Sequence, residues 1–182
     1  MVQDRALNQH ACALLVKSDS SAPPPPQSTQ VGRNDNVMGA CAGAALYHTS
    51  MLKKIGLFDP DFFLNYEDAD LSLRAIVQGW HVAYCPPSII YHKGSASINK
   101  IRNTEYQIRS QRNQLFAYLH NMPLLVILLN LPAIFAKDLL AILVSFLIFK
   151  WRISWVLIRS RLEIILWFPI ILRKRRKVLA QQ

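Results

Sequence analysis

Residues 56–79 read GLFDPDFFLNYEDADLSLRAIVQG, and this stretch decides how the rest of the chain is interpreted. Residues 58–60 are typical of a turn, because aspartate and proline both favour turn conformations. Residues 67–78 predict a helix, since acidic side chains crowd its first turn, where the helix dipole favours negative charge. Gly79 is expected to end that helix. Three apolar residues recur at helical spacing and support this helix: Leu73, Ile76 and Val77.

The flanking segments predict strands and one further short helix. Residues 11–16 are apolar enough for a short strand, and residues 80–84 alternate as a strand does. The prolines at 86–87 are expected to break this second strand before another short one at 88–92. A short helix is predicted over 51–55. Because strands and helices alternate, the fold class is expected to be α/β.

The composition divides the chain into three parts. Residues 1–36 contain four consecutive prolines and predict an extended, poorly defined loop segment. Residues 37–120 carry the mixed strand and helix pattern of the predicted domain. Residues 121–182 predict hydrophobic helices that associate with a membrane, followed by a basic C-terminal tail.

The net charge of +10 is confined to one half of the chain. Residues 1–100 hold eight Lys/Arg and eight Asp/Glu, whereas residues 101–182 hold thirteen and three. The basic half is also the more apolar, which favours anionic lipid over nucleic acid as a partner. The basic run at 173–177 favours the cytoplasmic face of the cell membrane. We therefore expect an anionic membrane as a partner and no nucleic acid.

Residues 124–149 are mostly apolar and long enough to cross a bilayer. Lys137 and Asp138 interrupt them, and each would cost about 2.5–3.5 kcal/mol at the bilayer centre. Either one span or two shorter helices that meet near 132–138 is consistent with this pattern. Residues 153–172 predict a helix that lies in the interface or packs on the first, and the core helices of a soluble bundle are the alternative.

The three cysteines, Cys12, Cys41 and Cys85, are far apart in the sequence. No two are spaced as the ligands of a zinc site. Each is expected to be a small buried residue in a reducing cytoplasm.

An ordered series of residues resembles the motifs of a known family of enzymes: Gly56, Phe58-Asp59, Phe62-Phe63, Glu67-Asp68, Asp70-Leu71, Arg74, Gly79, Pro86 and His92. The similarity is to family-2 inverting glycosyltransferases, and within them to the acceptor-side half of rhamnosyl- and galactofuranosyl-transferase-like enzymes of cell-surface polysaccharides. The run of small residues at 39–46 is similar to their sugar-pocket segment, and Arg112-Asn113 to an Arg-Asn pair that follows their catalytic domain. Where the family usually has His-x-x-Gly-x-Ser, residues 92–97 read HKGSAS, with the glycine one residue early.

The resemblance implies roles for three of these residues. Asp68 would be the catalytic base, and Glu67 would orient the acceptor. A carboxylate at a helix N-terminus suits proton removal from an acceptor hydroxyl. His92 would help to bind the divalent metal, Mn or Mg, that carries the nucleotide diphosphate, because neutral imidazole can ligate such ions. A structural or exposed histidine is the alternative.

Six further residues are candidates for substrate binding. The two arginines among them match phosphate oxygens, or they form a solvated helix edge. The two aromatic residues stack on a sugar, or they pack in the core. The six are Gly39, Ala40, Tyr66, Trp80, Arg109 and Arg112.

The implied reaction moves a sugar from a UDP- or dTDP-sugar donor to a lipid-linked or polysaccharide acceptor. The family's nucleotide-binding half, with its Asp-x-Asp motif, is not recognised in this sequence. We therefore expect an incomplete GT-A-type domain, inactive alone, for which a separate nucleotide-binding half is a candidate partner. An inactive remnant, or a membrane-associated interaction protein, is the alternative function.

Overall fold

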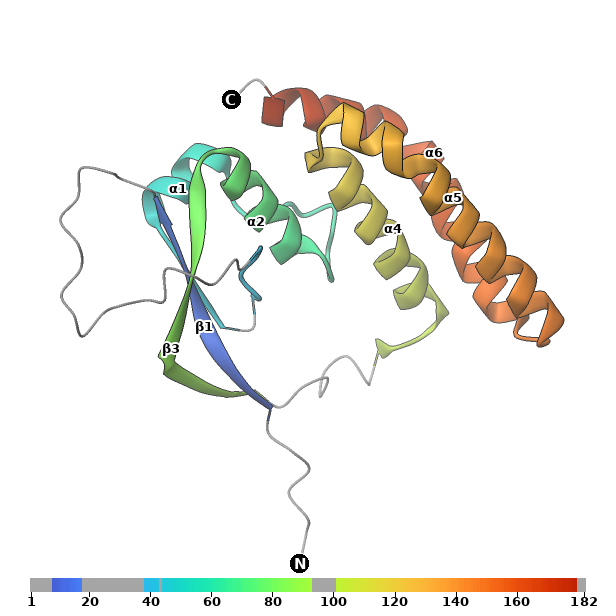
Figure 1. The fold of residues 1–182 in the computed structure, drawn as a ribbon, viewed down its shortest axis with the longest axis horizontal. Helices are drawn as coiled ribbons and strands as arrows, with labels where there is room; N and C mark the ends of the chain where they lie inside the picture. The colour runs from blue at the N-terminus through green and yellow to red at the C-terminus, as the bar shows by residue number, and fades with distance from the viewer. Residues whose placement is uncertain (1–7, 18–37, 43, 93–100, 180–182) are drawn as a thin grey trace, which may run out of the picture. The chain divides into compact units, whose positions relative to one another are not determined.

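A computed structural model describes residues 8–17, 38–42, 44–92 and 101–179, with the backbone alone for 8–17 and 83–92. The chain forms two compact units (Figure 1). Unit 1 comprises Met1–Asp59 and Asp68–Asn99, and unit 2 comprises Pro60–Glu67 and Lys100–Gln182. Each unit is described by itself.

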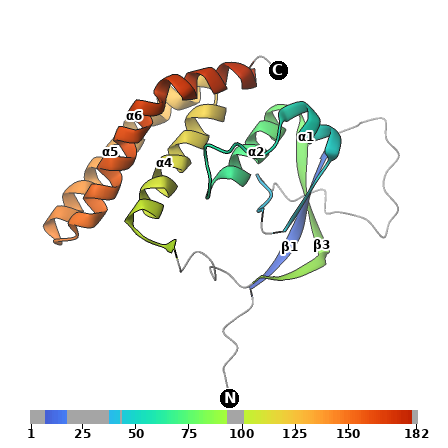
Figure 2. The same cartoon turned by 180° about the vertical axis from the view of Figure 1, so that it is seen from behind.

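Unit 1 contains a three-stranded sheet in the order β2-β1-β3. The central strand β1, Asn8–Lys17, pairs antiparallel with β3, Trp80–His92 (Figure 1, Figure 2). It also pairs in parallel with β2, Ala45–Tyr47. The strands predicted at 11–16 and 80–84 are therefore confirmed, and both are longer than expected.

The prolines at 86–87 do not end β3, so the prediction of a strand break is wrong. Cys85 lies opposite Cys12, but the next paired residue of β3, Ile89, lies opposite Ala11. Residues 86–88 are thus extra residues that bulge out of the ladder. Proline has no N–H to donate, so a bulge lets the ladder skip this segment and resume beyond it.

Two helices complete unit 1. Helix α1, Thr49–Ile55, ends at Gly56, whose φ of 85° suits glycine. Helix α2 spans Glu67–Val77 and is followed by Gly79 at a φ of 77°, as the sequence predicted. The core of the unit joins the sheet, the small-residue run and both helices, through Ala40, Met51, Ile55, Leu71, Ala75, Trp80 and Val82.

The buried face of α2 is centred on residues other than those whose spacing indicated the helix. Leu71 and Ala75 are completely buried, whereas Ile76 is 39% exposed. The apolar spacing of Leu73, Ile76 and Val77 correctly indicated a helix, but it did not include the two residues that lie deepest in the core.

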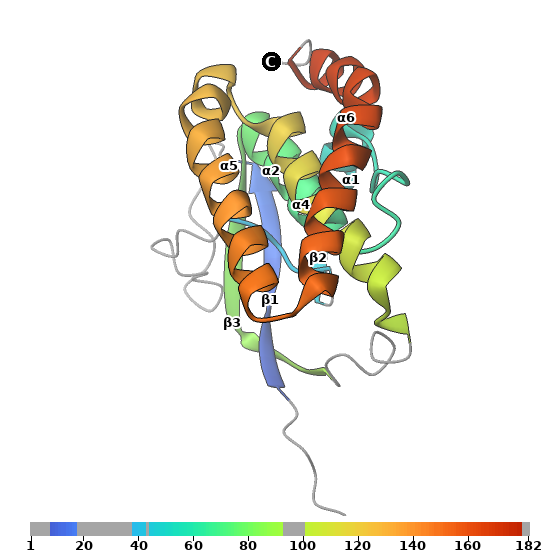
Figure 3. The same ribbon diagram turned by 90° about the vertical axis from the view of Figure 1, so that its right-hand side faces the viewer.

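Unit 2 consists of three long helices and the short segment Pro60–Glu67. These helices are α4, Thr104–Asn121, α5, Leu124–Leu147, and α6, Trp151–Leu179. Helices α5 and α6 form a hairpin, and α6 also packs on α4 (Figure 3). The core is aromatic and aliphatic, and comprises Phe62, Phe116, Ala117, Ile164 and Ile171.

Helix α5 continues through Pro132 without a break, so one helix forms instead of two shorter ones. Within the described residues it is the one helix long and apolar enough to cross a membrane. Helix α6 likewise continues through Pro169 and includes the basic run. The described residues are predominantly helical, and their sheet has only three strands. They therefore combine helices with a small sheet, but do not by themselves show the expected GT-A-type domain.

Candidate functional site

The carboxylate of Asp68 is held at the start of α2 by two backbone donors. One oxygen accepts a hydrogen bond from the Ala42 N–H at 3.2 Å, and the other from the Ala69 N–H at 2.8 Å. The side chain is partly buried, beside the exposed residues Cys41 and Ala42. Helix N-termini favour negative charge. These two bonds fix the orientation of the carboxylate at the start of the helix, with part of the side chain exposed.

One turn further along α2, the side chain of Ser72 contacts the run of small residues. Its hydroxyl oxygen accepts a hydrogen bond from the Ala40 N–H at 3.1 Å. A Cβ atom added at Gly39 would lie 3.3 Å from the Ser72 side chain, which is tighter than most real contacts. The small size of the 39–42 segment therefore lets its backbone reach α2 beside Asp68. The binding of sugar by Gly39 and Ala40 stays a prediction.

Ser72 was not identified from the sequence. The only signal was a serine, four residues after Asp68, at a position of α2 that the core covers. A buried hydroxyl needs a partner, and this partner comes from a segment 32 residues away. Residue spacing within one helix does not reveal such a partner.

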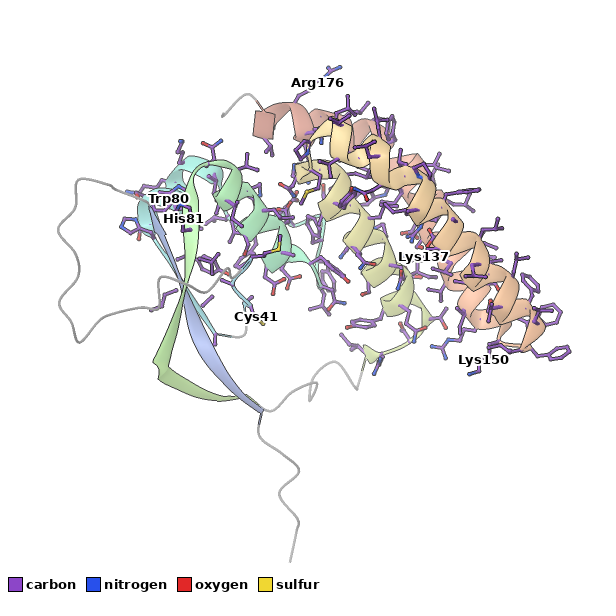
Figure 4. The ribbon with its side chains drawn as sticks, viewed as in Figure 1. Cys41, Trp80, His81, Lys137, Lys150 and Arg176 are labelled. Atoms are coloured by element: carbon purple, nitrogen blue, oxygen red, sulfur yellow. The ribbon has the colours of Figure 1, made fainter. Side chains whose placement is uncertain are left out.

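Cys41 is exposed, which corrects the prediction that it is buried (Figure 4). It lies in the turn whose next residue, Ala42, donates to Asp68. The buried residue of this segment is Ala40, which directly precedes Cys41. The thiol is therefore a surface group near the candidate base.

Two charged residues of the ordered series have structural partners. Arg74 donates to Asp70 at 2.8 Å, to the Ile55 carbonyl at 2.6 Å and to the Leu57 carbonyl at 2.9 Å. The guanidinium thus satisfies carbonyls at the C-terminus of α1, where a cation is favourable. Asp70 and Arg74 join α1 to α2, and neither is placed as a substrate ligand.

The segment before Glu67 has an uncommon backbone. Phe63, Asn65 and Tyr66 have φ angles of 58°, 68° and 69°, in the left-handed region that non-glycine residues seldom adopt. The fully buried side-chain amide of Asn113 donates to the carbonyls of Phe62, Leu64 and Asn65 at 2.7, 2.9 and 3.0 Å. These bonds hold the left-handed turn in place, and strain of this kind is typical of functional segments.

Arg112 uses its donors inside unit 2. It donates to the Asn113 side-chain oxygen at 2.8 Å and to the Asp61 carbonyl at 3.1 Å, and its guanidinium lies 4.4 Å from the Trp167 ring centroid. Burial lowers the pKa of Arg112, and the nearby Glu163 carboxylate opposes that shift. These contacts describe a residue that positions the turn. Its contact with diphosphate remains a prediction.

The other candidates lie as follows. Arg109 is on the edge of α4, 3.4 Å from Glu105 and 5.6 Å from the Phe63 ring centroid. Trp80 lies in the core of unit 1, which is the packing alternative that the sequence left open. Tyr66 packs against the aromatic core of unit 2. Glu67 is the first residue of α2, immediately before Asp68.

His92 is the last residue of β3, where its backbone pairs with Asn8. Its side chain lies outside the described residues. Among the side chains that are described, no group of three His, Cys, Asp or Glu residues could hold a metal ion. The Mn or Mg ion therefore stays a prediction.

The hairpin presents an apolar surface with one buried ion pair. Exposed leucine, isoleucine, phenylalanine and tryptophan side chains occur along both α5 and α6. Asp138, 8% exposed, accepts two hydrogen bonds from Arg161 at 2.6 and 3.1 Å. Arg161 of α6 thus neutralises the carboxylate of Asp138 in α5. The spacing of residues within α5 alone did not indicate this pairing between the two helices. Such an exposed apolar surface marks an interaction with a membrane or a partner.

The basic run is part of α6, so it is not a separate tail. Lys174 pairs with Asp61, and Arg175 donates to the carbonyls of Leu119 and Met122. Three of its five cations remain exposed: Arg173, Arg176 and Lys177.

Comparisons with protein-family models, with curated proteins and with solved structures found no match for this chain.

Proposed function

We propose that the chain supplies the acceptor-side half of an inverting glycosyltransferase at the cytoplasmic face of the cell membrane. The observation that carries the proposal is the Asp68 carboxylate, held by the Ala42 and Ala69 N–H groups beside a run of small residues. Its fold would be part of a GT-A-type domain of family 2. The left-handed turn that precedes α2 adds a second feature typical of functional segments.

In this proposal Asp68 takes the proton from an acceptor hydroxyl as the hydroxyl oxygen attacks the anomeric carbon of the donor sugar. The nucleotide diphosphate leaves from the opposite face of that carbon, which inverts its configuration. Glu67 orients the acceptor, a lipid-linked or polysaccharide sugar. The donor is a UDP- or dTDP-sugar held with Mn or Mg, and a nucleotide-binding half completes its site.

The membrane part of the proposal rests on the hairpin. Apolar side chains of α5 are exposed over most of its circumference, and only 6% of an apolar 18-residue stretch of this helix is buried. Arg173, Arg176 and Lys177 add exposed positive charge beside this surface. Acidic lipid headgroups attract such basic residues, and the cytoplasmic leaflet of a cell membrane contains such headgroups.

Sugar transfer in membranes that contain the chain and its nucleotide-binding partner tests the proposal. Radiolabelled UDP- and dTDP-sugars are supplied with Mn, and label is measured in lipid extracts and polysaccharide. Asp68→Asn keeps an oxygen for one of the two backbone N–H groups, replaces the other oxygen with an NH2 group and removes the base, and is expected to lower transfer at least about 100-fold. Glu105→Gln, which neutralises an exposed carboxylate in the first turn of α4, is the control and should retain transfer. Unchanged transfer in Asp68→Asn would refute the assignment.

A membrane-associated interaction protein is the second candidate. It is favoured by the same exposed apolar surface of α5 and α6, which needs no chemistry at Asp68. The two candidates differ in one expected result. Membranes that contain the chain and its nucleotide-binding partner should transfer sugar if the chain is part of an enzyme, and should not if it is only an interaction protein.

A further inference from the structure

A pocket lined by both polar and apolar side chains interrupts the apolar surface of unit 2. It has a volume of about 330 Å³ and lies between one stripe of α4 and one stripe of α5, with a residue of α6 at its edge. This volume is at the lower end of the range for small-molecule sites. The lining residues are Gln114, Leu115, Tyr118, Asn130, Ile134, Lys137 and Arg161.

The charge of this pocket is positive. Lys137 and Arg161 line it, and no acidic residue does. Arg161 is committed to Asp138 through two hydrogen bonds, and it also donates to the Gln111 carbonyl at 3.2 Å. The Lys137 ammonium lies 3.5 Å from the same Asp138, but one carboxylate balances only one of the two cations. The local excess is therefore one positive charge, on a lysine side chain that is 64% exposed.

The polar groups around Lys137 suit a phosphate ester. The Tyr118 hydroxyl and the Asn130 amide each donate to the Val126 carbonyl, at 3.1 and 2.8 Å, which keeps both side chains in place. Gln114 is exposed on the α4 side and carries further N–H donors. Lysine binds a phosphate as a point charge, and neutral amide N–H groups can donate hydrogen bonds to the phosphate oxygens. The apolar surface on both sides, including Leu131 and Phe135, suits acyl chains.

We propose that this pocket binds the phosphate headgroup of an anionic membrane lipid, whose chains lie along α5. The inference rests on the proposed membrane association, but not on the sugar-transfer chemistry. It also bears on orientation. Lys137 lies near the middle of α5, about 20 Å from its first residue at 1.5 Å per residue. A headgroup reaches that position when the hairpin lies along the leaflet surface, with α5 parallel to it.

The positions of the other cations agree with this orientation. Lys150 at the hairpin turn and Arg176 near the end of α6 are exposed basic residues (Figure 4). Arg159, along α6, is also exposed. A hairpin perpendicular to the bilayer would place Lys137 and Arg159 far from the headgroups. One that lies in the interface keeps all of them at headgroup depth.

Flotation of the full chain with vesicles tests the proposal. Binding to phosphatidylcholine vesicles is compared with binding to vesicles that also contain phosphatidylglycerol. Lys137→Gln and Lys150→Gln each remove one exposed lysine charge, and only the first lies in the pocket. Loss of a general surface attraction is expected to weaken binding about fivefold in either variant. Loss of the headgroup contact should weaken binding of Lys137→Gln by about a further tenfold.

Two additional arms make the outcome decisive. Asn130→Leu fills the pocket but changes no charge, and should also lose the preference for phosphatidylglycerol, while thermal unfolding checks that each variant is folded. Inorganic phosphate at matched ionic strength should not displace the vesicles. Equal loss in the two lysine variants, or an unaffected Asn130→Leu, would overturn the pocket assignment, and displacement by phosphate would overturn the lipid assignment. None of these readouts involves Asp68, so their failure is separate from failure of the transferase proposal.

Discussion

The side-chain amide of Asn113 donates a hydrogen bond to the carbonyl of Phe62 at 2.7 Å, across 51 residues of the chain. Phe62 is itself fully buried, with its ring stacked on Phe116 at a centroid distance of 4.7 Å. Asn113 thus holds the backbone of this segment, together with Arg112, which donates to the Asp61 carbonyl. That segment ends at Glu67, the first residue of α2 and the neighbour of the candidate base.

Asn113→Ala is expected to destabilise unit 2, because three backbone carbonyls lose their donor. Each buried group left without a partner costs about 1–3 kcal/mol, so the free energy of unfolding should fall by about 2–4 kcal/mol. Urea unfolding followed by tryptophan fluorescence measures this change. Gln114→Ala, at the adjacent exposed position, is the control and should change stability by less than about 0.5 kcal/mol. Equal stability of the two variants would contradict the role assigned to Asn113.

Arg74→Met should destabilise unit 1 more than any substitution on the exposed side of α1 or α2. The variant removes the ionic partner of buried Asp70 and the donors to Ile55 and Leu57. Breaking a buried ion pair costs about 3–5 kcal/mol. Lys53→Met, on the exposed side of α1, is the matched loss of a cation and should have little effect in the same thermal unfolding experiment. A fall in melting temperature as large in Lys53→Met as in Arg74→Met would exclude this explanation.

Asp138 and Arg161 should be strongly coupled. A double-mutant cycle with Asp138→Asn and Arg161→Met, measured by unfolding in detergent micelles, is expected to give a coupling free energy above about 1 kcal/mol. Glu105 and Arg109 form an exposed pair four residues apart on α4, for which about 0.3–0.5 kcal/mol is expected. If both cycles gave the same small value, the ion pair between the two helices would not stabilise the hairpin.

Cys41 should react readily with a maleimide, because its thiol is exposed. A bulky adduct there would stand beside Ala42 and Asp68, and is expected to lower sugar transfer in the membrane assay. Mass spectrometry locates the adduct. Cys41→Ala should transfer sugar normally and be insensitive to the reagent, which separates modification at this site from modification elsewhere. Full transfer by the labelled protein would place the acceptor away from this turn.

Local signals in the sequence were sufficient for the individual elements. Acidic residues before an apolar run and a glycine after it located α2, and Gly56 located the end of α1. These predictions succeeded because each depends on the backbone preferences of a few adjacent residues. The continuity of β3 was missed for the opposite reason. Its pairing beyond the two prolines depends on β1, which lies far away in the sequence.

The candidate site could be predicted only in part. Asp68 was found through the ordered series, and the approach of the small-residue run to α2 follows from the absence of large side chains at 39–42. Asn113, Ser72 and Arg161 act on backbone or carboxylate groups from other segments, and their own neighbours in sequence give no sign of it. Arg112 was expected to meet a ligand because arginine matches phosphate, but a guanidinium matches backbone carbonyls and aromatic rings equally well.

The dependence of residues 60–67 on α4 has a consequence for how the protein is made. During synthesis, the segment with three left-handed residues leaves the ribosome well before Asn113, so it has no partner for its carbonyls in that interval. At about 5–20 residues per second, the delay amounts to a few seconds. Unit 1 can form its helix-to-helix contacts through Arg74 in the meantime, whereas the turn ahead of Glu67 must wait for α4. A chain released before Asn113 would therefore carry the candidate base on a helix whose entry turn has not folded.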